Sequence, residues 1–350
     1  MTPVISFTLS RLTALVALSL FSATVARTTS PVTSEEMRIH GEASWRVATS
    51  LWGSAPWRPS GPSGFGPSAN RLRFEQIRLQ VARQLSPRLG EGVTVAILDT
   101  GVDSEHPDLR GVLNHAAAYD FITRQSGAGE EEGGSYTGHG TAVAGIIHQI
   151  APRARLLPLR VLTAEGRGAS DNVARAILYA ADQGANVINL SLGCAQRKPV
   201  ITAAIENVMA RGVIVVSSVG NQNRASADYP AAEAPQAALL VSVGSVDAQG
   251  TKSSFSNYGN TEVNANGERV ATLFPGGTTN VTGTSFATPQ VVGLIALALA
   301  EGRTPREVTE RLVGGAERLD ALSANAPYLG QLGGLVNATR LYPAPSLAQR

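Results

Sequence analysis

Short runs of apolar residues alternate with longer stretches of helical character over most of the chain. The apolar runs are rich in Val, Ile and Leu, and they are Val93–Leu98, Leu156–Val161, Val187–Leu190, Val213–Ser217 and Leu239–Val243. Helices are predicted at His139–Gln149, Asp171–Gln183, Ile201–Ala210 and Ser285–Ala300. Fully apolar strands spaced by helices are typical of a parallel sheet that is covered on both faces. We therefore predict an α/β fold with a doubly wound, mostly parallel sheet and helices on both faces.

The first residues of the chain differ from this pattern. Arg11 supplies a positive charge, and the apolar run Leu12–Ala26 is too short to span a bilayer comfortably. Polar residues begin at once at Arg27, which favours a signal peptide over residues 1–26; an uncleaved amphipathic anchor is the alternative. We expect a secreted protein, extracellular or in the cell envelope, with no membrane span in the mature form.

Residues 27–70 form a separate region. Pro, Gly and Ser crowd Ser54–Asn70, as is typical of a linker. The region holds all three tryptophans of the chain, Trp45, Trp52 and Trp57. We predict a removable pro-segment and linker over residues 27–70, with an ordered N-terminal arm as the alternative. The main domain then covers residues 71–342, and residues 343–350 form a C-terminal tail.

Composition narrows the class of protein. Hydrophobic residues make up 43% of the chain and charged residues 16%, which allows a large core and argues against disorder. The net charge of only +2 argues against a general nucleic-acid binder. The single cysteine, Cys194, permits no intrachain disulfide and no cysteine-based metal site. It is expected to line a loop, with a nucleophilic thiol as the alternative. No two histidines have a tight metal-ligand spacing, so no zinc site is predicted.

Four polar residues stand where strands end or helices begin. Asp99 ends the first apolar strand, His139 lies in a Gly-His-Gly-Thr motif at a helix start, and Asn221 follows another strand. Ser285 opens the last predicted helix, where free backbone N–H groups and the positive end of the helix dipole would stabilise an oxyanion. Each alone has an ordinary explanation: a ligand-binding carboxylate, a structural histidine, a turn and a helix cap.

Together, in the order Asp99, His139, Asn221 and Ser285, these motifs resemble the subtilisin family of serine peptidases over Phe74–Tyr342. The resemblance implies a subtilisin-like fold and an Asp-His-Ser triad. Asp99 would orient His139, which takes the proton of Ser285 and gives it to the leaving amine. Asn221 and the Ser285 N–H would hold the oxyanion. The resemblance implies a monomeric endopeptidase that acts on proteins and peptides and needs no cofactor for catalysis, with its own pro-segment as a partner.

Further matches to the family imply where a substrate lies. Ser191, Leu192 and Gly193 resemble the extended segment that pairs with the substrate backbone by strand addition. Gly166 and Gly168 belong to a segment that resembles the second, flanking substrate edge.

Asp228 stands directly before the pair Tyr229-Pro230. In the family, the residue before such a pair lies near the bottom of the primary specificity pocket. There an aspartate would favour Arg or Lys on the amino side of the scissile bond. A solvated loop aspartate is the alternative.

The chain departs from the family at two places. Ala142 stands where many members carry a second histidine, which leaves the mechanism intact. Ile146–Ile150 runs directly into Ala151-Pro152, so the loop that binds a tight calcium ion in many subtilisins is absent. Acidic residues before His139 would either gather a cation or form a solvated loop, and we expect the solvated loop. They are Asp120, Glu130, Glu131 and Glu132.

Two other classes of protein compete with an active peptidase. A pseudoenzyme that kept only the fold is disfavoured because no triad or oxyanion position is substituted. A dinucleotide-binding enzyme that uses Asp99 is disfavoured because no Gly-x-Gly-x-x-Gly motif follows the first strand.

Overall fold

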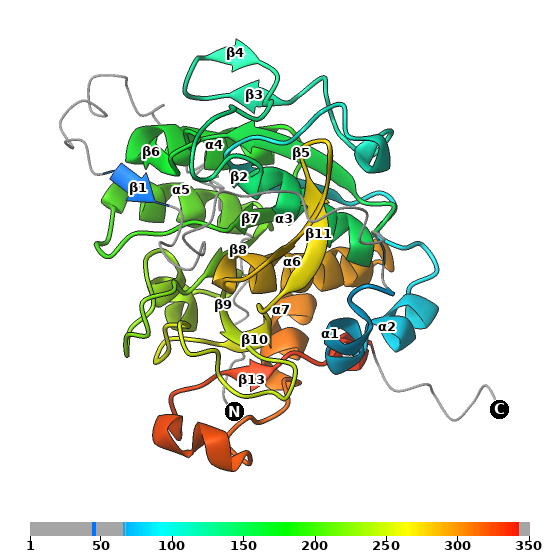
Figure 1. Cartoon of the computed structure of the whole chain (residues 1–350), viewed down its shortest axis with the longest axis vertical. Helices are drawn as coiled ribbons and strands as arrows, with labels where there is room; N and C mark the ends of the chain where they lie inside the picture. The colour runs from blue at the N-terminus through cyan, green and yellow to red at the C-terminus, as the bar shows by residue number, and fades with distance from the viewer. Residues whose placement is uncertain (1–43, 47–65, 67, 343–350) are drawn as a thin grey trace, which may run out of the picture. The chain divides into compact units, whose positions relative to one another are not determined.

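One nine-stranded sheet runs through the centre of the fold (Figure 1). The computed structural model describes residues 44–46, 66 and 68–342, all within one compact unit. The strand order is β13-β10-β9-β8-β7-β2-β5-β3-β4, and adjacent strands are parallel except β3 and β4. The strands are β2 (Thr94–Asp99), β3 (Tyr119–Asp120), β4 (Gln125–Ser126), β5 (Arg155–Arg160), β7 (Val187–Leu190), β8 (Ile214–Ser218), β9 (Leu240–Val246), β10 (Val263–Asn266) and β13 (Gly334–Leu335).

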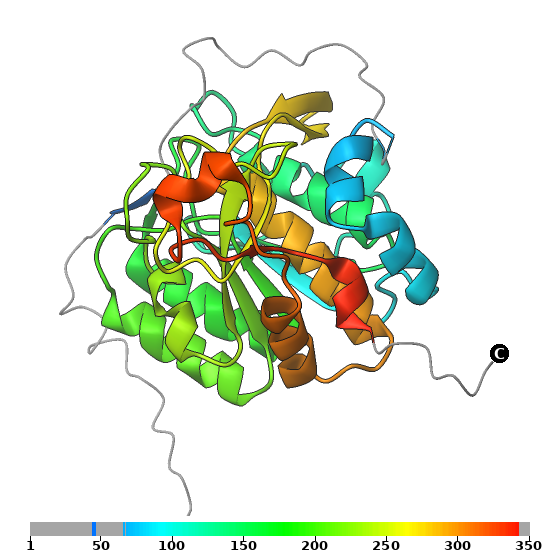
Figure 2. The ribbon, with the colours of Figure 1, turned by 90° about the horizontal axis from the view of Figure 1, so that it is seen from below.

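Helices cover both faces of this sheet (Figure 2). On one face lie α4 (Ser170–Asp182) and α5 (Pro199–Ala210). On the other face lie α1 (Arg71–Gln76), α2 (Leu79–Leu85), α3 (His139–Ile150), α6 (Thr284–Ala300) and α7 (Pro305–Gly314). Short 3-10 helices lie at Pro107–Leu109, Ala231–Gln236, Ser323–Tyr328 and Ala338–Leu341.

The central strand β2 shows why the sheet needs cover on both sides. Val95 and Ile97 pack into the core shared with α3 and α6, whereas Ala96 and Leu98 pack into the core shared with α4 and α5. A strand buried on both faces reads as a continuous apolar run. The predicted doubly wound α/β fold is therefore confirmed.

The predicted elements differ from the observed ones mainly at their ends. β9 continues past the predicted end at Val243 to Val246, and α5 begins at Pro199 instead of Ile201. Proline suits this first helical position because its missing N–H would have had no partner there. No pattern in the sequence predicted the helices α1, α2 and α7 or the strands β10 and β13, which are short or only partly apolar.

Asn70, directly before the predicted domain start at Arg71, packs into the folded core. Asn70 is fully buried. Its amide nitrogen donates to Gln149 Oε1 at 3.0 Å and to the Ala271 carbonyl at 2.7 Å, and its Oδ1 accepts from the Ala271 N–H at 2.9 Å. The predicted signal peptide, the C-terminal tail and most of the predicted pro-segment lie outside the described residues.

Two small antiparallel sheets complete the fold. The strands β11 (Val270–Phe274) and β12 (Gly277–Val281) form a hairpin beside α3. The strand β6 (Arg167–Ala169) pairs with β1 (Ser44–Arg46), which comes from the predicted pro-segment. Among the described residues, no helix is both long enough and apolar enough to cross a membrane.

Candidate active site

Three of the predicted site residues follow parallel strands of the central sheet. Asp99 is the last residue of β2, Ser191 follows β7, and Asn221 comes shortly after β8. In a parallel sheet these carboxyl ends lie along one edge, where ligands bind in folds of this kind.

Asp99 and His139 form a buried hydrogen-bonded pair. His139 Nδ1 lies 2.7 Å from Asp99 Oδ1, and each side chain has an exposed fraction of 1%. Asp99 Oδ1 also accepts from the Thr100 N–H at 2.8 Å. A carboxylate on Nδ1 holds the proton on that nitrogen, so Nε2 is left as the basic atom of the neutral ring.

The start of α3 approaches the Asp99 loop so closely that only glycine fits there. A Cβ atom at Gly140 would lie 2.0 Å from the carbonyl oxygen of Gly101. This backbone contact explains the second glycine of the Gly-His-Gly motif, because a larger residue after His139 would push the helix away from the loop.

Ser285 lies in the first turn of α6, next to the segment predicted to bind substrate. Its Oγ donates to the Ser191 carbonyl at 3.2 Å, and Ser191 Oγ donates to the Ser285 carbonyl at 2.8 Å. The next residue, Phe286, packs against His139 with ring centroids 5.1 Å apart. The start of α6 therefore brings Ser285, His139 and Ser191 into one site.

Asn221 is fixed by the residue before Ser285. Its Oδ1 accepts from the N–H and from the Oγ1 of Thr284, both at 2.9 Å. Because the oxygen is engaged in this way, the amide nitrogen points in a different direction. A Cβ atom at Gly283 would lie 3.5 Å from that nitrogen. A polarised donor thus lies beside the N-terminus of α6. The anchoring role of Thr284 was not predicted from the sequence.

The two predicted substrate-binding segments differ in structure. Ser191 and Leu192 are fully buried, and Gly193 faces Asp228, since a Cβ atom at Gly193 would lie 3.1 Å from Asp228 Cβ. Gly166 has a positive φ of 71° and precedes β6, which contains Gly168. A side chain at Gly168 would collide with the Val161 carbonyl, 2.3 Å from its Cβ position.

Asp228 is buried and ion-paired, so the alternative of a solvated loop aspartate is wrong. Its carboxylate contacts the guanidinium of Arg224. A Cβ atom at Gly220 would lie 2.5 Å from Asp228 Oδ2. Burial raises the pKa of Asp228, and the Arg224 charge opposes that rise. Both side chains line a cavity of about 550 Å³.

Of the four acidic residues expected in a solvated loop before His139, Glu131 and Glu132 are exposed, whereas Asp120 and Glu130 are not. Asp120 is buried and lies 2.8 Å from Arg160, which also contacts Glu131. Arg160 thus supplies a fixed positive charge to this cluster. Among the described residues, no group of three or more His, Cys, Asp or Glu side chains is arranged to hold a metal ion.

Glu130 also departs from that expectation. It is half-buried beside the start of α3, and burial raises its pKa to about 7 against the opposing hydrogen bonds from Thr141 and Gly138. Its place near the site was not predicted. An acidic residue shortly before a helix start was the only available signal, because carboxylates are favoured at helix N-termini.

Comparison with known proteins decides the family. The profile of the subtilase family matches residues 90–329. The chain belongs to the subtilase family. The matched residues include Asp99, His139, Asn221 and Ser285. Members of this family are serine peptidases, so the enzyme class is that of a hydrolase.

Individual proteins that are similar to this chain are also subtilisin-type serine peptidases. Thermitase from Thermoactinomyces vulgaris is 36% identical over 261 residues, which are 71% of this chain and 88% of that protein. Subtilisin BL from Lederbergia lenta is 38% identical over 219 residues, 59% of this chain and 76% of that protein. The crystal structure of a cold adapted subtilisin-like serine proteinase superposes with a TM-score of 0.62 and 32% identity, over 71% of this chain and 89% of that one.

Proposed function

We propose that this subtilase is a secreted serine endopeptidase that cleaves peptide bonds through an acyl-enzyme on Ser285. The observation that carries the proposal is the buried Asp99–His139 hydrogen bond of 2.7 Å beside the start of α6. His139 Nε2 takes the proton of Ser285 Oγ as the serine attacks the scissile carbonyl, and then gives it to the leaving amine. Asp99 stabilises the imidazolium that forms in between.

The oxyanion of the tetrahedral intermediate forms at the N-terminus of α6. Two donors serve it in this proposal: the backbone N–H of Ser285 and the amide of Asn221, whose oxygen is held by Thr284. Donors that are already fixed need no reorganisation during the reaction, which is why they lower the barrier.

The test is active-site labelling of the purified protein. A serine-directed fluorophosphonate should modify Ser285, and Ser285→Ala should lose both the label and about a million-fold in peptide hydrolysis. Asn221→Ala should keep the label but lose about a hundred- to a thousand-fold in kcat. Labelling of another residue, or near-normal hydrolysis by Ser285→Ala, would contradict the assignment of Ser285 as the nucleophile of the triad. An unlabelled and inactive wild-type enzyme would favour the pseudoenzyme.

The substrate is proposed to lie extended between Ser191–Gly193 and β6. Strand addition on such edges gives main-chain hydrogen bonds, and pockets for alternate side chains give specificity. In this pose Asp228, next to Gly193 and Gly220, lies at the base of the pocket for the residue before the scissile bond. The buried charge of Asp228 supports a preference for Arg or Lys.

The N-terminal region is proposed to be an inhibitory pro-segment that is removed on maturation. Support comes from β1, whose Ser44–Arg46 backbone pairs antiparallel with β6 and places Trp45 opposite Gly168. A segment on that edge excludes a substrate strand from it. Because all three tryptophans precede residue 68, the mature enzyme should emit only tyrosine-type fluorescence. Tryptophan emission from active protein freed of any bound peptide would contradict this.

Secretion rests on the N-terminal sequence and is tested by fractionation. The full chain, expressed in a bacterial host, should appear outside the cytoplasm with residues 1–26 removed. Replacing the apolar run Leu12–Ala26 with polar residues should retain the protein inside the cell. Retention of the unaltered chain in the cytoplasm would overturn the proposal.

A further inference from the structure

Helix α3 begins without a side-chain cap of its own. Its N-cap residue is Gly138, which has no side chain to accept a hydrogen bond. The first N–H groups of a helix have no partner within the helix, so partners must come from elsewhere. These groups matter here because the first residue of α3 is His139.

Glu130 supplies the missing acceptors from a separate loop. Its Oε2 accepts from the Gly138 N–H at 3.1 Å, and its Oε1 accepts from the N–H and Oγ1 of Thr141 at 3.0 and 2.8 Å. Gly138 and Thr141 lie on either side of His139. One carboxylate therefore holds the helix turn that carries the histidine.

The same carboxylate also holds the loop that carries Asp99. Thr100 Oγ1 donates to Glu130 Oε2 at 3.2 Å and accepts from the Gly140 N–H at 3.1 Å. Thr141 Oγ1 accepts from the Asp103 N–H at 2.8 Å. The Thr100 hydroxyl thus links Glu130 to α3, and the Thr141 hydroxyl links Glu130 to the loop that follows Asp99.

Backbone packing keeps Glu130 in this position. The Val102 N–H donates to the Ala128 carbonyl at 2.8 Å. Gly101, with φ of 113°, packs on the Gly129 carbonyl, where a Cβ atom would come within 2.3 Å. The residues just before Glu130 thus lie directly on the Asp99 loop, which makes the carboxylate a fixed part of the site.

We infer that Glu130 is a positioning residue that sets the geometry of the Asp99–His139 pair by tying the Asp99 loop to the first turn of α3. The inference rests on the proposed function, in which His139 is the general base. A base misplaced by a fraction of an ångström transfers the proton less often, whereas substrate contacts at Ser191–Gly193 and β6 are unchanged. Loss of Glu130 therefore acts on kcat rather than on KM.

The decisive variant is Glu130→Gln, which keeps the size of the side chain. Each of the two carboxylate oxygens accepts from two donors. In either orientation of a glutamine, the NH₂ group would therefore face two donors and lose those hydrogen bonds. We expect kcat to fall about ten- to a hundred-fold, with KM within about two-fold. Glu132→Gln, an exposed neighbour in the same loop, is the control for loop charge and should retain wild-type kinetics.

A second readout does not depend on turnover. The proton between His139 Nδ1 and Asp99 Oδ1 should give a far-downfield proton NMR signal in the wild type. This signal should shift or broaden in Glu130→Gln and persist in Glu132→Gln. If wild type shows this signal but neither labels nor hydrolyses, the proposed function fails and the positioning role is still measured. If Glu130→Gln does not fold, Thr100→Val removes one arm of the network and Thr100→Ser retains it. The serine variant should then keep the kcat that the valine variant loses.

Two results would overturn the inference. One is a folded Glu130→Gln with unchanged kcat and an unchanged downfield signal. The other is a loss of activity that is fully explained by a smaller amount of folded enzyme. In that case kcat per fluorophosphonate-reactive molecule equals the wild-type value, and Glu130 acts only on stability.

Discussion

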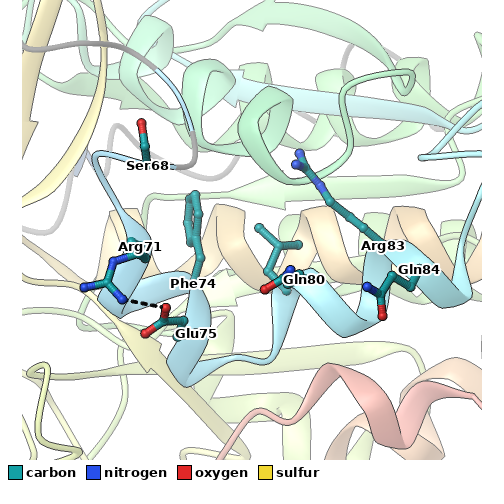
Figure 3. Close-up of a pocket in the computed structure, with 8 residues that line it drawn as sticks. Ser68, Arg71, Phe74, Glu75, Gln80, Arg83 and Gln84 are labelled. Atoms are coloured by element: carbon teal, nitrogen blue, oxygen red, sulfur yellow. Dashed lines mark hydrogen bonds and ion pairs between the residues drawn. The ribbon is translucent and has the colours of Figure 1, made fainter.

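The guanidinium of Arg83 donates from Nε to the carbonyl oxygen of Ile150, the last residue of α3, at 3.2 Å. Its Nη2 also donates to the Gln149 carbonyl. Arg83 extends from α2 toward α3 along a cavity of about 510 Å³ (Figure 3). The last carbonyls of a helix lack partners and carry partial negative charge. Arg83 therefore caps α3 from another helix, at the place where many subtilisins insert a calcium loop.

Removing this cap should destabilise the protein. Arg83→Met keeps most of the aliphatic stem but loses the charge and both hydrogen bonds. We predict a loss of about 1.5–3 kcal/mol in the free energy of unfolding, the range for hydrogen bonds to charged groups. Denaturant unfolding measures this loss, and Arg110→Met, at an exposed arginine, is the matched control. An equal loss in the two variants would mean that Arg83 is not a cap.

Calcium removal should have little effect on stability. Arg83 at the end of α3 and Arg160 between Asp120 and Glu131 place fixed positive charges beside oxygens that would otherwise attract a cation. We predict that a chelator leaves the melting temperature unchanged within error, measured by calorimetry on inhibited enzyme to prevent self-digestion. A large decrease that is restored by added calcium would contradict the prediction.

Arg224 should limit the proposed preference for substrates with Arg or Lys before the scissile bond, which rests on Asp228. Arg224 forms an ion pair with the Asp228 carboxylate, and its side chain is 42% exposed. A substrate Arg or Lys would have to displace Arg224 from this carboxylate. With matched peptides that carry Arg or Leu before the scissile bond, Asp228→Ser should lower kcat/KM for the Arg peptide by about ten-fold, equal to ~1.4 kcal/mol. Arg224→Ala should raise the Arg preference.

The control for Arg224 lies on the same cavity. Arg197 lines it too but pairs with Glu233 instead of Asp228. Arg197→Ala should therefore leave the ratio between the two peptides unchanged. A wild-type preference for Leu that Asp228→Ser does not alter would remove Asp228 from the pocket.

The contribution of Glu262 to stability should fall as pH rises through the weakly acidic range. Burial raises the pKa of Glu262 from 4.5 to about 7, against a hydrogen bond from the Ser242 N–H. Between these values the native state keeps a proton that the unfolded chain has lost, so the contribution of Glu262 to stability is greatest below about 4.5 and declines up to about 7. Glu130 acts in the same direction.

Glu262→Gln isolates one of these two contributions. Glutamine keeps an oxygen for the Ser242 N–H but does not titrate. The melting temperature of this variant should change less over the window than that of wild type, whereas Glu105→Gln, at an exposed site, should behave like wild type. Identical profiles for wild type and Glu262→Gln would show that Glu262 ionises at its ordinary pKa.

The sequence predicted the parts of the site that are set by local motifs. Asp99, His139 and Ser285 stand at strand or helix ends, where local patterns reveal them. Glu130 does not, because its role depends on a loop that folds back onto two other elements. Asp228 was left between two alternatives for the same reason. Its burial depends on Arg224 and Gly220, and no periodicity indicates which loops meet.

The same difference explains why Asp120 was wrongly expected to be solvated. Charged residues in a glycine-rich stretch are usually solvated, and nothing in the local sequence indicates that Arg160, at the end of β5, faces Asp120. Parallel pairing of β3 with β5 places Asp120 opposite Arg160 in register. The pairing is non-local and so is absent from any sequence window.

The pairing of β1 with β6 has a kinetic consequence. In the proposed role of β1 as part of a pro-segment, β1 belongs to the same chain as β6 and competes with substrate for this edge. Its effective concentration, on the order of millimolar, is then independent of enzyme dilution. Before cleavage, therefore, diluting the enzyme should not relieve inhibition. After the connection is cut, the freed peptide becomes an ordinary bimolecular inhibitor that dissociates on dilution, and activity should then rise with dilution until the peptide is fully released.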